Sequence, residues 1–151
     1  MNEDGVRPAR FLASGDRSLP IPAGAAVAEL AFCLPDLPDV RDFAAVWAVR
    51  GGMAPESLTD FLVAVNEVAT NAVTHGHTSA KAVLRIWAVG RNLVVEIHDQ
   101  GRWTPAEIPG QTPPAPYATS GMGLWVARMI SSDITVETGA AGTFITMFFK
   151  V

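Results

Sequence analysis

The chain has 151 residues, of which 49% are hydrophobic and 17% are charged, and its formal net charge is −4. This length and composition predict one globular domain with a single hydrophobic core. The negative charge argues against direct binding to nucleic acid, which requires clustered Lys and Arg. No uninterrupted apolar run approaches the roughly 20 residues of a membrane-spanning helix, and the N-terminus shows no signal-peptide pattern. We therefore expect a cytoplasmic protein that does not act at a membrane.

The N-terminal part of the chain, residues 1–24, combines Gly, Pro, Arg and Asp without lasting periodicity. This composition predicts a mobile tail in front of a domain that covers 25–151. Residues 28–34 are predicted to form the first strand. The apolar spacing that follows predicts a helix over about 38–50, which a Gly-Gly pair ends.

The second predicted helix runs from Pro55 to about His75, where Gly76 is a natural C-terminal cap. Glu67, Asn71 and His75 recur every four residues, so they lie on one stripe of this helix. The stripe lies opposite the apolar face, and periodicity alone allows it to be a solvated polar surface. The same column of carboxylate, amide and imidazole could also hold a metal-bound, charged ligand.

The second half of the chain predicts strands and one short helix around a proline-rich loop. Residues 100–119 hold five prolines, and a long loop of this kind in a compact domain often serves as a lid. Helices grouped between antiparallel hairpins predict a two-layer α/β sandwich of the α+β kind, with one mixed, mostly antiparallel sheet and helices on one face. The elements predicted in this half are strands at 82–89 and 93–98, a helix from 124 to about 131, and strands at 134–138 and 143–149.

A glycine motif, Gly121-Met122-Gly123, stands immediately before the short helix. Glycines allow backbone angles that aim several N–H groups at one point, and the helix dipole adds positive potential there. This arrangement suits phosphate groups, although a plain turn is the alternative. The motif is not a P-loop, because Gly-Lys-Ser/Thr is absent. It is not a dinucleotide-binding fingerprint either, because Val126 occupies the third glycine position.

Asp99 extends an apolar row formed by Leu93, Val95 and Ile97, so its carboxylate is expected to face inward or toward a cleft. A buried, unpaired carboxylate would be costly. A ligand amine such as adenine N6 could satisfy it, and Gly101 would let a flat ring approach the backbone. The alternative is an exposed Asp in a turn.

Asn71 offers the hard oxygen that Mg²⁺ prefers, and phosphate oxygens and water could complete its coordination. Glu67, one helical turn away, could act as a general base. The histidines raise zinc as another hypothesis. It is disfavoured because only His75 and His77 are close in sequence and the sole cysteine, Cys33, is distant.

Together these motifs resemble the boxes of the Bergerat ATP-binding fold, whose superfamily includes gyrase, histidine kinases and the heat-shock chaperone ATPase. The resemblance covers about 25–151. Within the superfamily, a stand-alone domain of this size with a short lid is similar to the bacterial anti-sigma-factor serine/threonine kinases. In order, the N, G1, G2 and final boxes are Glu67-x-x-x-Asn71-Ala72-x-x-His75-Gly76, Asp99-x-Gly101, Gly121-x-Gly123-Leu124 and Gly142-Thr143.

The resemblance implies a protein that binds ATP and Mg²⁺ and phosphorylates a Ser or Thr on an antagonist of the sulfate-transporter/anti-sigma-antagonist (STAS) type. It also implies that the protein sequesters an RNA polymerase sigma factor, and relatives often form homodimers. Trp103 departs from the pattern, because it stands where the G1 box often has a second glycine. The implied roles are Glu67 as general base, Asn71 as Mg²⁺ ligand, His75 as support of the site, Asp99 as adenine reader with Gly101 beneath the ring, Gly121, Gly123 and the Leu124 backbone at the phosphates, and Thr143 beside Asp99.

Two other functions stay open at this point. The chain could be a binding module that holds nucleotide and a partner without transferring phosphate. It could also be a metal hydrolase that uses its histidines. Transfer of labelled phosphate would favour the kinase, whereas tightly bound zinc would favour the hydrolase.

Overall fold

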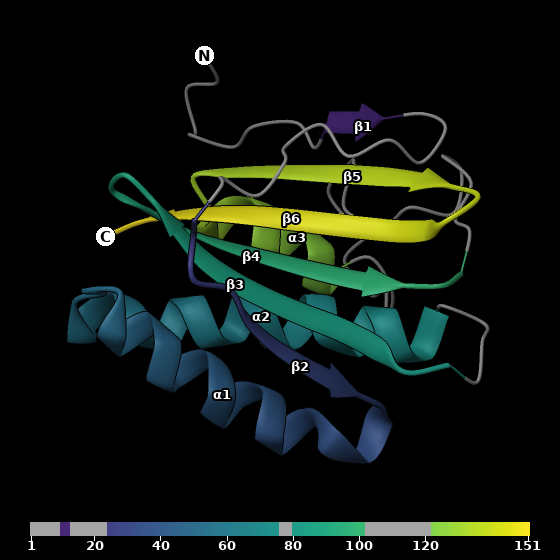
Figure 1. Ribbon diagram of the computed structural model, residues 1–151, viewed down its shortest axis with the longest axis horizontal. Helices are drawn as coiled ribbons and strands as arrows, with labels where there is room; N and C mark the ends of the chain where they lie inside the picture. The colour runs from purple at the N-terminus through teal and green to yellow at the C-terminus, as the bar shows by residue number, and fades with distance from the viewer. Residues whose placement is uncertain (1–9, 13–23, 76–79, 102–121) are drawn as a thin grey trace.

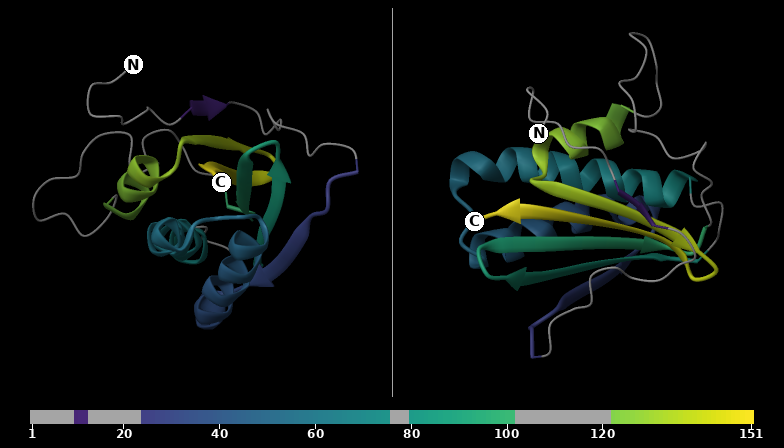
Figure 2. Two further views of the ribbon diagram at one scale, coloured as in Figure 1. Left: turned by 90° about the vertical axis from the view of Figure 1, so that its left-hand side faces the viewer. Right: turned by 90° about the horizontal axis from the view of Figure 1, so that it is seen from above.

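A computed structural model describes residues 10–12, 24–75, 80–101 and 122–151 (Figure 1). In this part of the chain, one six-stranded sheet carries its α-helices on a single face (Figures 1 and 2). The two layers confirm the predicted sandwich architecture. No helix of the described residues combines the length and the apolar character needed to cross a membrane.

The sheet is mixed but mostly antiparallel. Its spatial order is β1-β5-β6-β4-β3-β2. All neighbouring strands pair antiparallel except β1, which pairs parallel to β5. The strands are β1 (Arg10–Leu12), β2 (Ala28–Phe32), β3 (Ala82–Val89), β4 (Asn92–Asp99), β5 (Asp133–Gly139) and β6 (Gly142–Lys150).

The helices follow the predicted pattern closely. The apolar spacing of α2 continues without interruption for 21 residues, and Gly52, with a φ of 94°, ends the turn after α1. α3 begins two residues earlier than predicted. The helices are the short 3₁₀ helix η1 (Leu34–Asp36), α1 (Leu37–Arg50), α2 (Pro55–His75) and α3 (Met122–Ile130).

The structure adds two elements that the sequence did not predict. One is η1, and β2 accordingly ends at Phe32 instead of at residue 34. Residues Arg10–Leu12, inside the predicted tail 1–24, form β1 and pair with Thr135–Glu137 at the edge of the sheet. A three-residue strand is too short to show an alternating pattern, and its pairing partner is remote in sequence. The rest of the predicted tail up to residue 23, and residues 102–121 of the predicted lid, lie outside the described residues.

The hydrophobic core lies between the sheet and the helices. Alternate residues of β4, namely Leu93, Val95 and Ile97, contribute to it and pair across to β6, where Phe149 and other apolar residues face the same way. Phe149 also meets Phe61 of α2 edge to face, with ring centroids 4.7 Å apart. This packing fixes α2 across the sheet and thereby places its last turns beside the end of β4.

Candidate functional site

Three segments that are distant in sequence meet at one end of the molecule. The last turns of α2, the final residue of β4 and the turn between β5 and β6 all lie at the right-hand end of Figure 1. α3 also begins toward this end and runs back to the start of β5 (Figure 2). The predicted motifs on these elements therefore converge, although they come from separate parts of the chain.

Asp99, the last residue of β4, is a buried carboxylate. Its exposed fraction is 3%, as the apolar row before it predicted. Burial raises its pKa to about 6, and one hydrogen bond from the Gly101 N–H partly opposes this shift. That bond reaches Oδ1 at 2.7 Å. A carboxylate has a second oxygen, here Oδ2, which could accept a hydrogen bond from a donor on a ligand.

Thr143 lies opposite Asp99 on β6 and is fully buried. Its hydroxyl donates to the Gly101 carbonyl at 2.8 Å. The Thr143 hydroxyl is also 3.0 Å from that of Thr138 on β5. Because Thr143 uses its own hydrogen on Gly101, Thr138 must be the donor in this second bond. A chain of hydrogen bonds therefore ties the turn after β4 to β6 and β5.

Gly142, at the end of the β5–β6 turn, occupies a position that has no room for a side chain. Its φ is 107°, and an added Cβ would lie 2.1 Å from the Asp99 carbonyl oxygen and 2.9 Å from the Gln100 Cα. Both neighbours are backbone atoms that cannot rotate away. The β5–β6 turn therefore contacts the backbone of Asp99 directly.

The polar stripe of α2 is not a fully solvated surface. Glu67 and Asn71 are both half-buried, because α2 packs against α3 as well as against β4. The Nδ2 atom of Asn71 is buried and has no hydrogen-bond partner among the described residues. Since a buried amide without a partner is costly, this atom points to a ligand.

Comparison with known proteins identifies the family. A family model described as the histidine kinase-like ATPase domain matches residues 33–149. The chain belongs to the histidine kinase-like ATPase family. This confirms the family resemblance and the fold predicted from the motifs.

One curated relative and one solved structure add detail. The "Anti-sigma F factor" of Clostridium acetobutylicum is 34% identical over 89 residues, which are 55% of this chain and 62% of that protein. A crystal structure of the RsbU and RsbW domains of Rv1364c from Mycobacterium tuberculosis superposes with a TM-score of 0.62 at 20% identity. It covers 83% of this chain and 32% of that one, and at this identity it shows the shared fold alone.

The residues present fit the ligand that an ATPase domain binds. The unpaired Nδ2 of Asn71 could donate to a phosphate oxygen while its Oδ1 serves as a hard-oxygen metal ligand. Asp99 Oδ2 could accept from an amine on a base. Glu67, one turn before Asn71, adds a carboxylate on the same stripe. ATP binding agrees with the family, whereas Mg²⁺ remains a prediction from the donor set.

The structure describes only some of the remaining predicted residues. His75 is the last residue of α2, but its side chain is outside the described part, as are Gly121 and Trp103. Gly123 lies within the first turn of α3 instead of before the helix. The side chain of Leu124 is buried in the core, so only its backbone could line a ligand.

Sequence reasoning missed Thr138, which supports Thr143 through the hydrogen bond described above. It ends a predicted strand, and nothing in the local pattern distinguishes it from other strand threonines. Its role follows only from the pairing of β5 with β6, which places it opposite Thr143. Among the described residues, no group of three or more His, Cys, Asp or Glu is placed to hold a metal ion.

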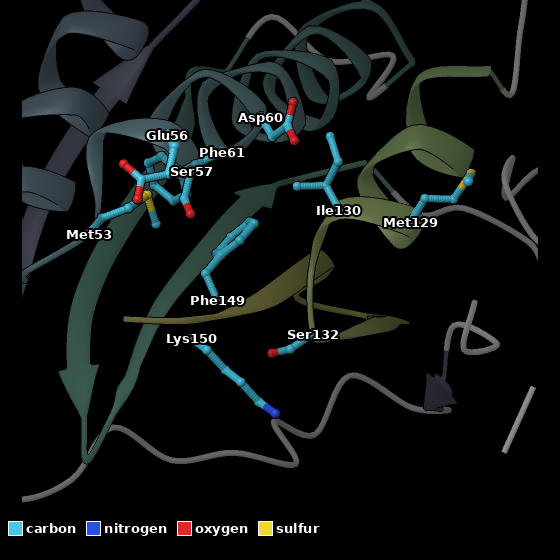
Figure 3. A pocket seen from close by; sticks show the side chains of 10 residues that line it. All are labelled: Met53, Glu56, Ser57, Asp60, Phe61, Met129, Ile130, Ser132, Phe149 and Lys150. Carbon is cyan, nitrogen blue, oxygen red and sulfur yellow. The ribbon is translucent and has the colours of Figure 1, made fainter. Parts of the chain in front are cut away.

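A cavity of about 590 Å³ lies at the other end of α2 and contains none of the predicted site residues (Figure 3). It lies between the first turns of α2, the end of α3 and the end of β6. Glu56 and Asp60 line one wall, and Phe61 and Phe149 form the apolar part. We place the candidate site at the opposite end of α2, because Asp99 is a buried carboxylate there and the buried Nδ2 atom of Asn71 has no partner among the described residues.

Proposed function

We propose that the chain is a Mg·ATP-dependent anti-sigma regulatory factor of the cytoplasm. In this role it phosphorylates a Ser or Thr on a STAS-type antagonist and sequesters an RNA polymerase sigma factor. The observation that carries the proposal is Asp99, a carboxylate at the end of β4 whose burial raises its pKa to about 6 and whose Oδ1 accepts from the Gly101 N–H. The chain belongs to a family of ATPase domains, and one relative is named an anti-sigma factor. The alignment spans 62% of that relative, so the partners are part of the proposal.

Each residue of the site has a distinct part in this function. Asp99 would accept a hydrogen bond from adenine N6, with Gly101 beneath the ring. Asn71 would hold Mg²⁺, which neutralises phosphate charge when bound. Glu67 would accept the proton of the Ser or Thr hydroxyl of the antagonist. The hydroxyl oxygen would then attack the γ-phosphorus, and the bond between this phosphorus and the ADP leaving group would break. Positioning and charge stabilisation would supply most of the rate acceleration.

The glycine box and its neighbours would complete the phosphate site. Gly123 and the backbone of Leu124 lie in the first turn of α3, where N–H groups and the helix dipole favour anions, and Gly121 would join them as part of the same sequence motif. His75 would support the site from the end of α2, and Thr143 would hold the turn beside Asp99. These assignments rest on the motif order and on the convergence of α2, α3 and β4 at one end.

Phosphotransfer can be tested with γ-labelled ATP, Mg²⁺ and the cognate antagonist. We expect label on a Ser or Thr of the antagonist with the wild-type chain. Glu67→Ala should lower transfer by about 10²-fold or more, the usual contribution of a general base. Glu56→Ala is the matched control, because Glu56 is an exposed carboxylate at the far end of the same helix. It should transfer at the wild-type rate.

The same experiment addresses the binding module without phosphotransfer. If the chain retains nucleotide and antagonist but no label appears, the module is correct and the kinase is not. Equal loss of label in Glu56→Ala and Glu67→Ala would remove the assignment of Glu67 as the base. Tightly bound zinc in metal analysis would instead favour the hydrolase.

A further inference from the structure

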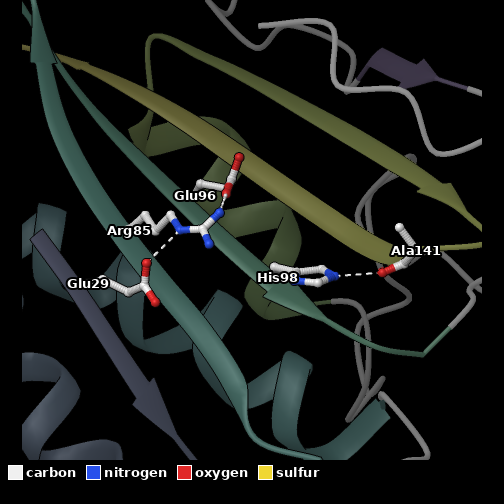
Figure 4. A network of polar contacts seen from close by, with 5 residues as sticks. All are labelled: Glu29, Arg85, Glu96, His98 and Ala141. Atoms are coloured by element: carbon white, nitrogen blue, oxygen red, sulfur yellow. Dashed lines mark hydrogen bonds and ion pairs between the residues drawn. The ribbon is translucent and has the colours of Figure 1, made fainter. Parts of the chain in front are cut away.

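His98 precedes Asp99 in β4, but its side chain lies on the opposite face of the sheet, away from the helices. There it pairs across to Phe144 of β6, and the two rings stack with centroids 4.0 Å apart and an interplanar angle of 4°. Its Nε2 atom is 2.7 Å from the carbonyl oxygen of Ala141 (Figure 4). Since a carbonyl can only accept, the ring hydrogen must be on Nε2.

This hydrogen bond joins the end of β4 to the turn between β5 and β6. Ala141 immediately precedes Gly142, the residue whose absent side chain lets the turn contact the Asp99 backbone. An added Cβ at Gly142 would also lie 3.0 Å from His98 Nε2. His98 therefore holds the turn against β4 on the sheet face that points away from the helices.

Thr143 connects the end of β4 and the β5–β6 turn on the other face of the sheet, which the helices cover. Its hydroxyl donates to the Gly101 carbonyl, and the Gly101 N–H donates to Asp99 Oδ1. Movement of the turn away from β4 would carry Thr143 with it, because Thr143 follows Gly142 directly. Gly101 would then lose its bond from Thr143, and the orientation of the Asp99 carboxylate would be less fixed.

We propose that His98 is a positioning residue for the adenine-binding carboxylate. It fixes the β5–β6 turn and, through Thr143 and Gly101, the geometry of Asp99, without touching the nucleotide itself. The inference rests on the proposed function only where it assigns Asp99 to adenine. The mechanical part, that His98 holds the Asp99–Gly101 turn, concerns the nucleotide-free protein.

Two variants separate the functions of the His98 ring. His98→Phe keeps an aromatic ring to stack on Phe144 but removes the donor to Ala141. His98→Gln keeps an N–H donor and removes the ring. Val83→Ala is the matched control, because Val83 pairs with His98 from β3 on the same face and its aliphatic side chain cannot form a hydrogen bond with the turn.

The first measurement is amide hydrogen exchange without nucleotide. In His98→Phe, the Gly101 amide should exchange about fivefold faster, as expected for loss of one hydrogen bond. Val95, in the middle of β4, should keep its wild-type exchange rate. His98→Gln should restore most of the Gly101 protection, and Val83→Ala should leave it unchanged.

The second measurement is the affinity for ATP and GTP by calorimetry. His98→Phe should weaken ATP binding about fivefold and leave weak GTP binding unchanged, so discrimination between the bases falls. His98→Gln should recover it. A merely structural role would lower both affinities in proportion to overall stability, which thermal unfolding reports.

The outcomes distinguish this inference from the proposed function. Unchanged Gly101 exchange in a folded His98→Phe protein would overturn the positioning role. So would a His98→Gln protein that behaves like His98→Phe, or a His98→Phe protein that does not fold while His98→Gln folds without protecting Gly101. Faster Gly101 exchange in a chain whose wild type does not bind ATP would leave the positioning of the turn intact and refute the nucleotide site.

Discussion

At the scale of single residues, the candidate site is defined by polar groups that the fold buries. Asp99 is the clearest case, because burial raises its pKa to about 6. The ordinary pKa of an Asp carboxyl is about 3.9, so the shift is about two units, or roughly 3 kcal/mol. Since the pKa is higher in the folded state, ionised Asp99 opposes folding. The penalty is absent well below pH 4, grows between about pH 4 and 6, and is complete above pH 6.

The first prediction concerns Asp99→Asn. The amide keeps an acceptor for the Gly101 N–H but carries no charge, so the variant should be more stable than wild type by about 2 kcal/mol at pH 7.5. The difference should shrink as the pH falls toward 4. Urea unfolding at pH 4.5, 6 and 7.5 measures it.

The same variant should bind ATP at least tenfold more weakly, because an amide donor faces the adenine amine. A gain in stability with a loss of binding is typical of a functional site that strains the fold. Equal urea midpoints for Asp99→Asn and wild type at all three pH values would contradict the burial argument. Unchanged ATP affinity in the folded variant would remove Asp99 as the adenine reader.

The sequence singled out candidate site residues for two different reasons. Asp99 extends a row of apolar residues, where a carboxylate conflicts with its surroundings, and Asn71 lies on a polar stripe opposite the apolar face of α2. His98 was considered only as a zinc ligand. Its contact with Ala141 depends on how the β5–β6 turn meets β4, and no local pattern encodes that meeting. Thr138 was missed for the same reason.

At the scale of elements, the β5–β6 hairpin connects strand geometry to the site. Gly142 should tolerate no side chain, because its φ is 107° and a Cβ would overlap the Asp99 carbonyl. We predict that Gly142→Ala destabilises the protein by about 3 kcal/mol or more, from backbone strain and forced separation of β4 and β6. Chemical denaturation measures this loss.

Gly90, in the β3–β4 turn, provides the matched control for this prediction. It also has a positive φ, 58°, but a Cβ there would have nothing within 4 Å. Gly90→Ala should therefore cost only about 1–2 kcal/mol, the ordinary penalty of the left-handed conformation. Similar losses for the two variants would show that conformation alone matters and that the contact with Asp99 does not.

The elements themselves were largely predictable. α1 and α2 show helical apolar spacing with glycine near their ends. The pairs β3–β4 and β5–β6 are largely apolar runs joined by short turns that contain glycine. The start of α3 was predicted two residues too late, because glycine disfavours a helix interior. In the structure Gly123 lies in the first turn of α3. β1 was not predictable, since a three-residue strand gains its stability from the remote partner β5.

At the scale of the whole molecule, α2 connects two different ends. Its first turns line the cavity of Figure 3, and its last turns carry Glu67 and Asn71. Packing of α2 on β4 and α3 makes the site a property of the entire fold. A ligand that engages Asn71, Asp99 and the start of α3 together would therefore link separately folded parts of the chain and stabilise the whole domain.

The last prediction follows from this linkage. At a concentration of Mg·ATP 100 times its Kd, binding should stabilise the folded state by about 2.7 kcal/mol, which corresponds to a Tm increase on the order of 5–10 °C. Mg·GTP should give a much smaller shift, because its base presents a carbonyl where adenine has the amine that Asp99 would accept. Chelation of Mg²⁺ with EDTA should reduce the ATP shift, since Asn71 would then lose the ion between it and the phosphates. Asp99→Asn should start from a higher Tm at pH 7.5 and gain little from Mg·ATP.

Equal Tm shifts with ATP and GTP would refute base recognition by Asp99. An ATP-induced Tm shift that EDTA does not change would refute the metal site at Asn71.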